Sequence, residues 1–491
     1  MWKVWLIMTL CMACSNKDIL NVSITPLAQE TVMDPSTVYF LNEYYLIENL
    51  SLRLVEMDAK EGYKLMLASS INIDISKKIY RISIKETYFS NGDRVLIEDV
   101  KKSFTRAMGN NNSHINLKEI VKSISIDGEE LRLELLKPTN DFFYFLTLID
   151  LSILHKTQYE KPELRAKDWT TATSGPFSYL IEKNGDTYLL KNPHFKLTSI
   201  TYPDKIKLLS ARGRNSYQDY KEGLVDIGEF NLNSYDKHIN ELHEDKNLSV
   251  IGNTGDMVNF LALNANSDRF KTEYNRRWIL KKITENLVIP TKYDQVARKA
   301  FEFFTPQVKG FLGEEEILKE IRTWDNINTK VIPNELKQGI TISTYERAYE
   351  VTLEGILDQL ESILNIPVKI ETNIKSINFE SFIKSNKFDI FLGITSMDQV
   401  IVGESINLYY FSSFPMFKDV NGEIRKLMDE YRHSSKPTIS TIKKIALQMI
   451  KDAECVPLFY VASPFFYNKS KVDISNLDEL TYFNLWKIKL K

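Results

Sequence analysis

The chain has 491 residues, 43% of them hydrophobic, and its 63 basic and 65 acidic residues give a formal net charge of -2. This length exceeds one ordinary hydrophobic core, so we expect two or three lobes. The near balance of charge excludes nucleic acid as a main partner, because phosphate binding requires a basic excess on the binding face.

The N-terminal segment has the pattern of an export signal. Lys3 precedes an apolar run over residues 4–13 that is too short to span a bilayer as a helix. The small Ala13 stands before Cys14, so the segment resembles a bacterial lipoprotein signal, in which residues 1–13 are removed and Cys14 is lipidated. Such a lipid anchors a protein to a membrane surface without spanning it. An ordinary secretion signal and a buried N-terminal strand are the alternatives.

Three segments have the features of β-hairpins. Residues 80–84 alternate apolar and polar side chains, and Asn91-Gly92 then supplies a tight turn, because both residues tolerate positive φ. The other two hairpins are residues 124–126 with 131–136 around Asp127-Gly128, and residues 177–182 with 187–191 around Asn184-Gly185.

Helical spacing of apolar residues predicts amphipathic helices over residues 96–108, 347–364 and 437–452. Residues 367–372 and 388–393 have the composition of strands that follow helices. Hairpins combined with such helix–strand units predict a mixed α/β fold.

Signals for catalysis or metal binding are weak in this sequence. His238 and His243 lack the spacing of a zinc motif, and the chain has neither a G-x-S-x-G motif nor a phosphate-binding loop. Cys455 stands in an apolar strand and is expected to be a buried thiol. We therefore expect no metal, no cofactor and no enzymatic activity.

The segment from Tyr80 to Met108 carries a family resemblance. It contains Phe89-Ser90-Asn91-Gly92, followed by Asp99, Val100, Ser103 and Arg106, and this pattern resembles the signature of the family 5 extracytoplasmic solute-binding proteins of ABC importers. Further segments resemble that family in the expected order: Met33-Asp34-Pro35, residues 135–145, Ser174-Gly175-Pro176-Phe177, residues 191–195, residues 223–227, residues 261–264 and residues 455–460.

The resemblance implies an α/β fold of two large lobes, a clamshell of the type II periplasmic-binding-protein kind, with an extra inserted α/β lobe. Hinge closure would enclose the ligand between the large lobes. The expected divisions are residues 14–52, 170–258 and 464–491 for the first lobe, 53–169 for the inserted lobe, and 259–463 for the second large lobe.

The resemblance also implies an acidic residue that pairs with the α-ammonium group of a peptide ligand. The corresponding region is residues 393–400, where Asp398 occupies the position of the acid, while Thr395 and Gln399 replace the family's aromatic residues. A desolvated carboxylate facing an ammonium makes a charge-assisted hydrogen bond. Three further residues are expected near the ligand: Ser396, Met397 and Asn264.

The expected function is capture of short peptides outside the cytoplasm by a lipid-anchored monomer that delivers them to an ABC permease. Three alternatives stay open: the same fold serving as a ligand sensor, a different solute such as a sugar, a nickel chelate or an opine, and a hydrolase on a degenerate scaffold.

Overall fold

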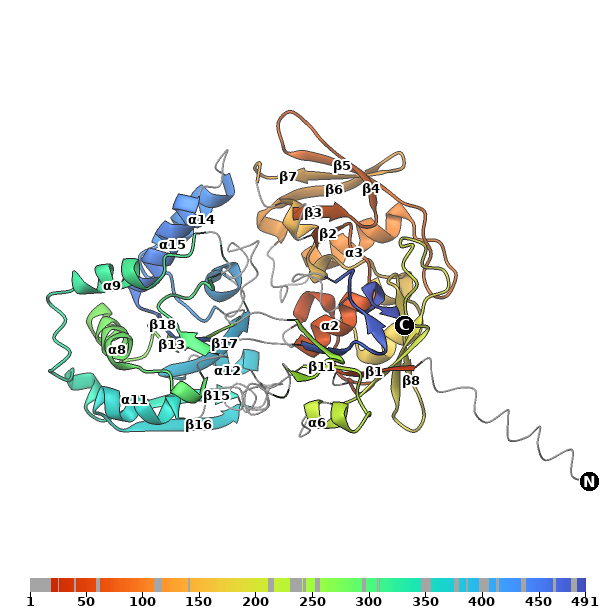
Figure 1. Cartoon of the computed structure of the whole chain (residues 1–491). Helices are drawn as coiled ribbons and strands as arrows, with labels where there is room; N and C mark the ends of the chain where they lie inside the picture. Colours follow the sequence, from red (N-terminus) through yellow and green to blue (C-terminus); the bar gives the residue numbers. More distant parts are fainter. Residues whose placement is uncertain are drawn as a thin grey trace, which may run out of the picture.

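The computed structural model describes the following residues: 19–24, 26–38, 41–58, 62–109, 117–139, 142–210, 216–229, 241, 244–251, 257–293, 297–306, 308, 310–345, 355–374, 379–385, 387–396, 406–411, 415–433, 439–461, 465–477 and 484–491. Their strands form two large sheets in two separate lobes and a smaller sheet at one end of the first lobe (Figure 1). The lipidation candidate Cys14 and the site candidates Met397 and Asp398 lie outside the described residues.

The sheet of the first lobe has seven strands in the order β12-β19-β11-β1-β10-β9-β8. Strand β1 pairs in parallel with both β10 and β11, and the remaining pairs are antiparallel. The strands are β1 (Ile19–Ser23), β8 (Phe177–Ile181), β9 (Thr187–Lys191), β10 (Lys205–Leu208), β11 (Ile227–Glu229), β12 (Leu248–Ile251) and β19 (Phe465–Asn468). The helices of this lobe include α2 (Leu41–Leu50) and α6 (Ser216–Lys221).

The inserted lobe is built on an antiparallel sheet in the order β4-β5-β7-β6. Its strands are β4 (Ala68–Ile73), β5 (Ile79–Ile84), β6 (Val121–Asp127) and β7 (Glu130–Leu135), and a two-stranded ribbon, β2 (Val55–Asp58) with β3 (Gly62–Leu65), precedes them. Helix α3 (Ile97–Gly109) packs on β6 and β7 through its apolar face, which carries Val100, Phe104 and Ala107. The amphipathic spacing predicted this helix within one residue at each end.

The second large lobe holds a six-stranded sheet in the order β14-β18-β13-β17-β15-β16. Its strands are β13 (Met257–Leu263), β14 (Ala297–Lys299), β15 (Ile340–Tyr345), β16 (Val368–Ile374), β17 (Ile390–Ser396) and β18 (Cys455–Val461). Residues of α8 (Glu273–Asn286), α9 (Glu314–Arg322) and α11 (Ile356–Leu364) cover one face. The other face is covered by residues of α12 (Phe379–Ser385), α14 (Glu423–His433) and α15 (Ile439–Asp452).

Strand β13 shows why this sheet is buried on both faces. Successive side chains of a strand point to opposite sides. Accordingly Leu261 and Leu263 join the core beneath α8 and α11, whereas Phe260 and Ala262 join the core beneath α14 and α15. The lobe therefore has one hydrophobic core on each side of a shared sheet.

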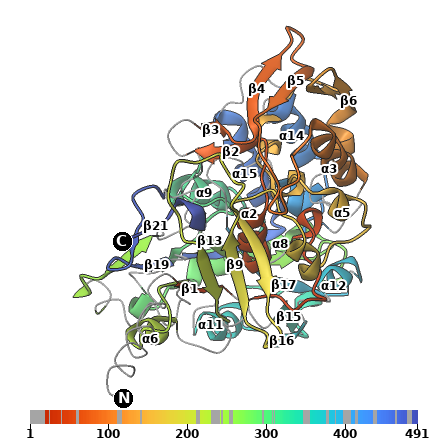
Figure 2. The same ribbon diagram turned by 90° about the vertical axis from the view of Figure 1, so that its right-hand side faces the viewer.

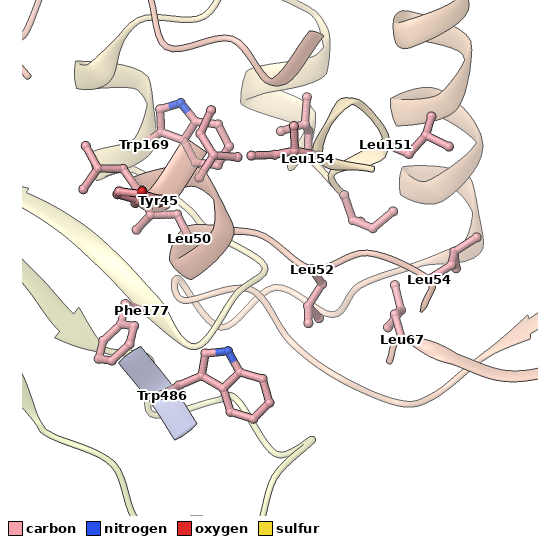
Figure 3. Close-up of a cluster of buried hydrophobic side chains, with 14 of the residues drawn as sticks. Tyr45, Leu50, Leu52, Leu54, Leu67, Leu151, Leu154, Trp169, Phe177 and Trp486 are labelled. Carbon is pink, nitrogen blue, oxygen red and sulfur yellow. The ribbon is translucent and has the colours of Figure 1, made fainter. Parts of the chain in front are cut away.

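One continuous hydrophobic core links the first lobe to the inserted lobe. Figure 3 shows Tyr45 and Leu50 of α2 close to Trp169, with Leu52 and Leu54 leading toward Leu67 of the inserted lobe. Because a close-packed core resists shear, we infer that these two lobes move as one body. The second large lobe has separate cores, so relative motion is expected between it and this body.

The chain passes twice between the large lobes, and the strand ends that flank the two crossings lie next to each other. The chain leaves β12 for β13 through residues 252–256, and it returns from β18 to β19 through residues 462–464. Strands β12 and β19 pair in the first sheet, and β13 and β18 pair in the second. Figure 2 shows the first sheet in front of the second. Two adjacent connections between lobes can act as a hinge.

The hairpin expected at residues 80–92 is only partly correct. Gly92 has φ of 90° in a tight turn, as predicted, and this turn closes an isolated bridge between Tyr88 and Arg94. Strand β5, however, pairs with β4 and β7 rather than with the segment after the turn. The other two hairpins are confirmed as β6–β7 and β8–β9.

Candidate functional site

The candidate site lies where the two large sheets face each other across the crossings. In the first lobe, Phe465 follows a crossing and pairs with both Ile251 and Glu229, so the carboxyl end of β11 lies at this edge. Ser23, at the carboxyl end of β1, pairs with Gly228 beside it. In open α/β sheets, ligands bind outside the carboxyl ends of parallel strands. This edge of the first sheet is therefore suited to a ligand.

The second sheet presents the same kind of edge to the junction. Ser396, the last residue of β17, pairs with Met257, the first residue of β13 after the crossing. Strand β15 runs parallel to both β16 and β17, so the carboxyl ends of all three strands lie on this side of the sheet. Two carboxyl edges thus meet at the junction, and Met397 and Asp398 directly follow Ser396 in the sequence.

Strand β17 is held in position by close packing on both faces. Ile390 and Leu392 join the core on one side, and Phe391 joins the core on the other. A Cβ atom on Gly393 would approach the ring of Phe260 to 2.7 Å, so a larger residue at this position would displace that ring in the core. This packing fixes the register that carries Ser396 to the junction.

Asn264 lies at the opposite end of β13. Its side chain donates a hydrogen bond to the carbonyl of Phe388 (2.7 Å) and accepts one from the backbone N–H of Asn266 (3.0 Å). Seven residues of extended strand separate it from Met257, a distance of roughly 23 Å. The structure thus does not bring Asn264 and Ser396 together, and Asn264 is engaged in holding the turn after β13.

Sequence reasoning missed Ser23 and Glu229 at the junction edge. Their position at the junction follows from the parallel pairing of β1 and β11, which are about 200 residues apart. The signal that could have found Glu229 is an acid at the end of the short apolar strand β11.

The motifs behind the family resemblance form scaffold contacts away from the junction. Arg106 of α3 pairs with the buried carboxylate of Asp34, which also accepts hydrogen bonds from Ser36 and from the backbone N–H of Leu164 (3.0 Å). Burial acts to raise the pKa of Asp34, but hydrogen bonding and the charge of Arg106 outweigh it and hold this pKa below its usual value. This ion pair joins the loop after β1 to the inserted lobe.

Buried acids with raised pKa values lie elsewhere in the second lobe. Burial raises the pKa of Asp452 to about 6 and that of Glu454 to about 7. The carbonyl of Glu454 accepts a hydrogen bond from the N–H of Leu263, which places this acid at the far end of β13 from the junction. These groups are therefore not part of the candidate site. No helix within the described ranges is both long and apolar enough to cross a membrane.

Comparison with known proteins agrees with this architecture. The model of the bacterial extracellular solute-binding proteins, family 5, matches residues 62–415. No curated protein matches the chain.

Solved structures show the same fold at low sequence identity. The periplasmic binding protein DppA from Helicobacter pylori, in complex with the peptide STSA, is 20% identical, with a TM-score of 0.77 over 96% of this chain and 98% of that chain. A dipeptide-binding protein from Pseudoalteromonas sp. SM9913, in complex with Met-Leu, is 13% identical, with a TM-score of 0.78 over 96% and 100% of the two chains.

A nickel-binding relative has the fold as well. NikZ from Campylobacter jejuni, in complex with Ni(L-His), is 17% identical, with a TM-score of 0.73 over 97% of this chain and 100% of that chain. The match of the family model covers well over half of the sequence, and the fold agrees with it. The chain belongs to family 5 of the bacterial extracellular solute-binding proteins.

Proposed function

We propose that this protein captures short peptides between its two large lobes and delivers them to an ABC permease, without a catalytic step of its own. The observation that carries the proposal is the meeting of two carboxyl edges at a doubly crossed junction, with Ser396 at one edge and Ser23 at the other. Two of the similar structures hold peptides, which supports a peptide over other solutes.

Closure would bury the ligand and offset its loss of freedom, and the closed form would dock on the permease. The chain acts as a monomer in this scheme.

We further propose that lipidated Cys14 anchors the protein at an extracytoplasmic membrane surface. The variant Cys14→Ser should then move from the membrane fraction to the soluble fraction on cell fractionation, and an unchanged distribution would argue against the anchor.

Asp398 is proposed to pair with the α-ammonium of the peptide, with Ser396 and Met397 beside it. A buried ligand charge that loses its partner costs several kcal/mol. Asp398→Asn should therefore weaken peptide binding roughly 100-fold or more. Asp325→Asn, on an exposed residue of the same lobe, is the matched control and should bind as the unmodified protein does.

The test begins with native mass spectrometry of freshly purified protein, which identifies a retained ligand by mass, followed by calorimetry with that ligand. We expect one peptide per chain. A retained nickel chelate or opine would overturn the peptide assignment while leaving the capture mechanism. If Glu229→Gln abolishes binding and Asp398→Asn does not, the acid at the first-lobe edge takes the role assigned to Asp398.

A further inference from the structure

A pocket lies in the second large lobe, away from the junction. It has a volume of about 460 Å³, and all of its lining residues fall between Asn264 and Arg425, within this one lobe. Asn264 marks the end of β13 opposite to the end that carries Met257. The pocket is therefore distinct from a cleft that needs both lobes, and its volume falls within the range of small-molecule sites.

The floor of this pocket is apolar and largely aromatic. It is formed by Phe388 before β17, Ile383 of α12, Tyr410 and Phe417, all of which are buried. The hydrophobic core beneath α14 reaches the protein surface at this point, so aromatic rings from separate chain segments meet here. Such a floor accepts a ring or a branched aliphatic group.

Among the described residues that line the pocket, three are cations, Lys384, Lys418 and Arg425, and the last two are each held by a neutral group. The Nζ atom of Lys418 donates a hydrogen bond to Oδ1 of Asn266 (2.7 Å). The guanidinium of Arg425 lies over the ring of Phe411, 4.4 Å from its centroid. Neither cation forms an ion pair with a carboxylate of the described residues. Their partners thus fix their positions without cancelling their charges.

Asp419 is the one acid among the described residues that line the pocket, and it is already engaged. The carboxylate of Asp419 accepts hydrogen bonds from the backbone N–H groups of Ile424 (3.0 Å) and Arg425 (2.9 Å), at the start of α14. A carboxylate in this position caps the helix and complements its dipole. The described lining residues comprise three cations and this one carboxylate, so they carry a net positive charge above an apolar floor.

We propose that this pocket binds a small aromatic carboxylate, with its ring on the floor beside Phe388 and its carboxylate between Lys418 and Arg425. The two cations favour a carboxylate over an uncharged ligand, because a hydrogen bond from an ionised donor to a carboxylate is stronger than a hydrogen bond between neutral groups. The site operates independently of the peptide site at the junction, since none of the described residues of the first lobe lines it.

The test uses 3-phenylpropanoate as the probe and 3-phenylpropanamide as its uncharged counterpart, titrated into the full mature protein by calorimetry. We expect the acid to bind at least about tenfold more tightly than the amide. The double variant Lys418→Gln/Arg425→Gln should lose that preference. Lys426→Gln, which removes an exposed cation of α14 that pairs with Glu423, is the matched control and should retain it.

Three results would overturn the proposal: equal affinity for acid and amide, no detectable binding of the acid, or unchanged affinity in the double variant. Circular dichroism establishes that each variant is folded. The location is tested separately with Asp398→Asn, which should bind 3-phenylpropanoate as the unmodified protein does. Displacement of the probe by a peptide would place it in the inter-lobe cleft and contradict an independent site.

Discussion

Glu302 is a buried carboxyl group in the second large lobe. One oxygen, Oε1, accepts hydrogen bonds from the backbone N–H groups of Leu312 (2.6 Å) and Gly313 (2.9 Å), and the other, Oε2, has no hydrogen-bond partner among the described residues. Burial raises the pKa of Glu302 to about 7, even though the two backbone hydrogen bonds favour the ionised form. The desolvation penalty thus outweighs the hydrogen bonds.

This raised pKa predicts a stability that falls as pH rises. Between the unfolded pKa of 4.5 and the folded pKa of about 7, the folded state binds more protons than the unfolded state, so the free energy of unfolding decreases with increasing pH. Glu302→Gln keeps an acceptor for both N–H groups without a charge. It should raise the free energy of unfolding at pH 8 by up to about 3 kcal/mol.

Urea unfolding at pH 5 and pH 8 checks this prediction. The variant should show a weaker dependence on pH than the unmodified protein, with the remaining dependence carried by Asp452 and Glu454, whose pKa values are also raised by burial. Glu285→Gln, at an exposed position, should behave as the unmodified protein does. A variant that is less stable than the unmodified protein at pH 8 would contradict the account.

The role of a single residue could be predicted where it depends only on its neighbours in the sequence. Asn91-Gly92 indicates a turn with positive φ, and Gly92 has it. Gly175 is needed for a different reason, since a Cβ atom there would approach the backbone carbon of Leu50 to 2.5 Å. That contact joins segments about 125 residues apart, so the local sequence does not contain it.

At the scale of elements, the ion pair between Arg106 and Asp34 links α3 of the inserted lobe to the loop after β1. The side chains of Arg106 and Asp34 are 11% and 2% exposed, so loss of one partner leaves the other charge buried and unpaired. Such a loss costs about 3–5 kcal/mol. Arg106→Met should therefore lower the free energy of unfolding by an amount in this range.

The matched control is the ion pair between Arg81 and Asp127 on the exposed face of the inserted sheet, where the side chains are 41% and 59% exposed. Exposed pairs contribute at most about 1 kcal/mol, so Arg81→Met should have little effect. Chemical denaturation of both variants provides the comparison. Equal effects of the two substitutions would show that the buried pair does not tie the lobes together.

The spacing of apolar residues predicted individual helices and strands, but it did not predict which strands pair with each other. Alternation and turn residues located β6–β7 and β8–β9, and helical spacing located α3, because these signals are contained within short windows. The parallel pairing of β1 with β10 and β11 was not predictable in this way. That pairing places Glu229 at the junction, which is why half of the candidate site was missed.

At the scale of the whole molecule, the second large lobe contacts the inserted lobe opposite it. Nδ1 of His433, at the end of α14, donates a hydrogen bond to the carbonyl of Pro138 (2.9 Å), which lies between β7 and α4 (Phe142–Phe145). This contact spans the gap between the lobes, away from the crossings. In this structure the two lobes therefore touch at a point other than the crossings.

The family resemblance, and not composition, predicted the two-lobed arrangement, and the solved structures agree with it. Separate cores and paired crossings give that arrangement a physical basis, since the second lobe can rotate without disturbing the core shared by the other two. The mechanism depends on this rotation.

Small-angle X-ray scattering with and without the retained peptide tests the central claim most directly. The account predicts that the radius of gyration falls when the peptide binds, and that Asp398→Asn shows no such decrease at the same peptide concentration. If calorimetry shows the peptide bound to the unmodified protein while its scattering curve stays unchanged, the lobes do not close around the ligand, and capture by closure is contradicted.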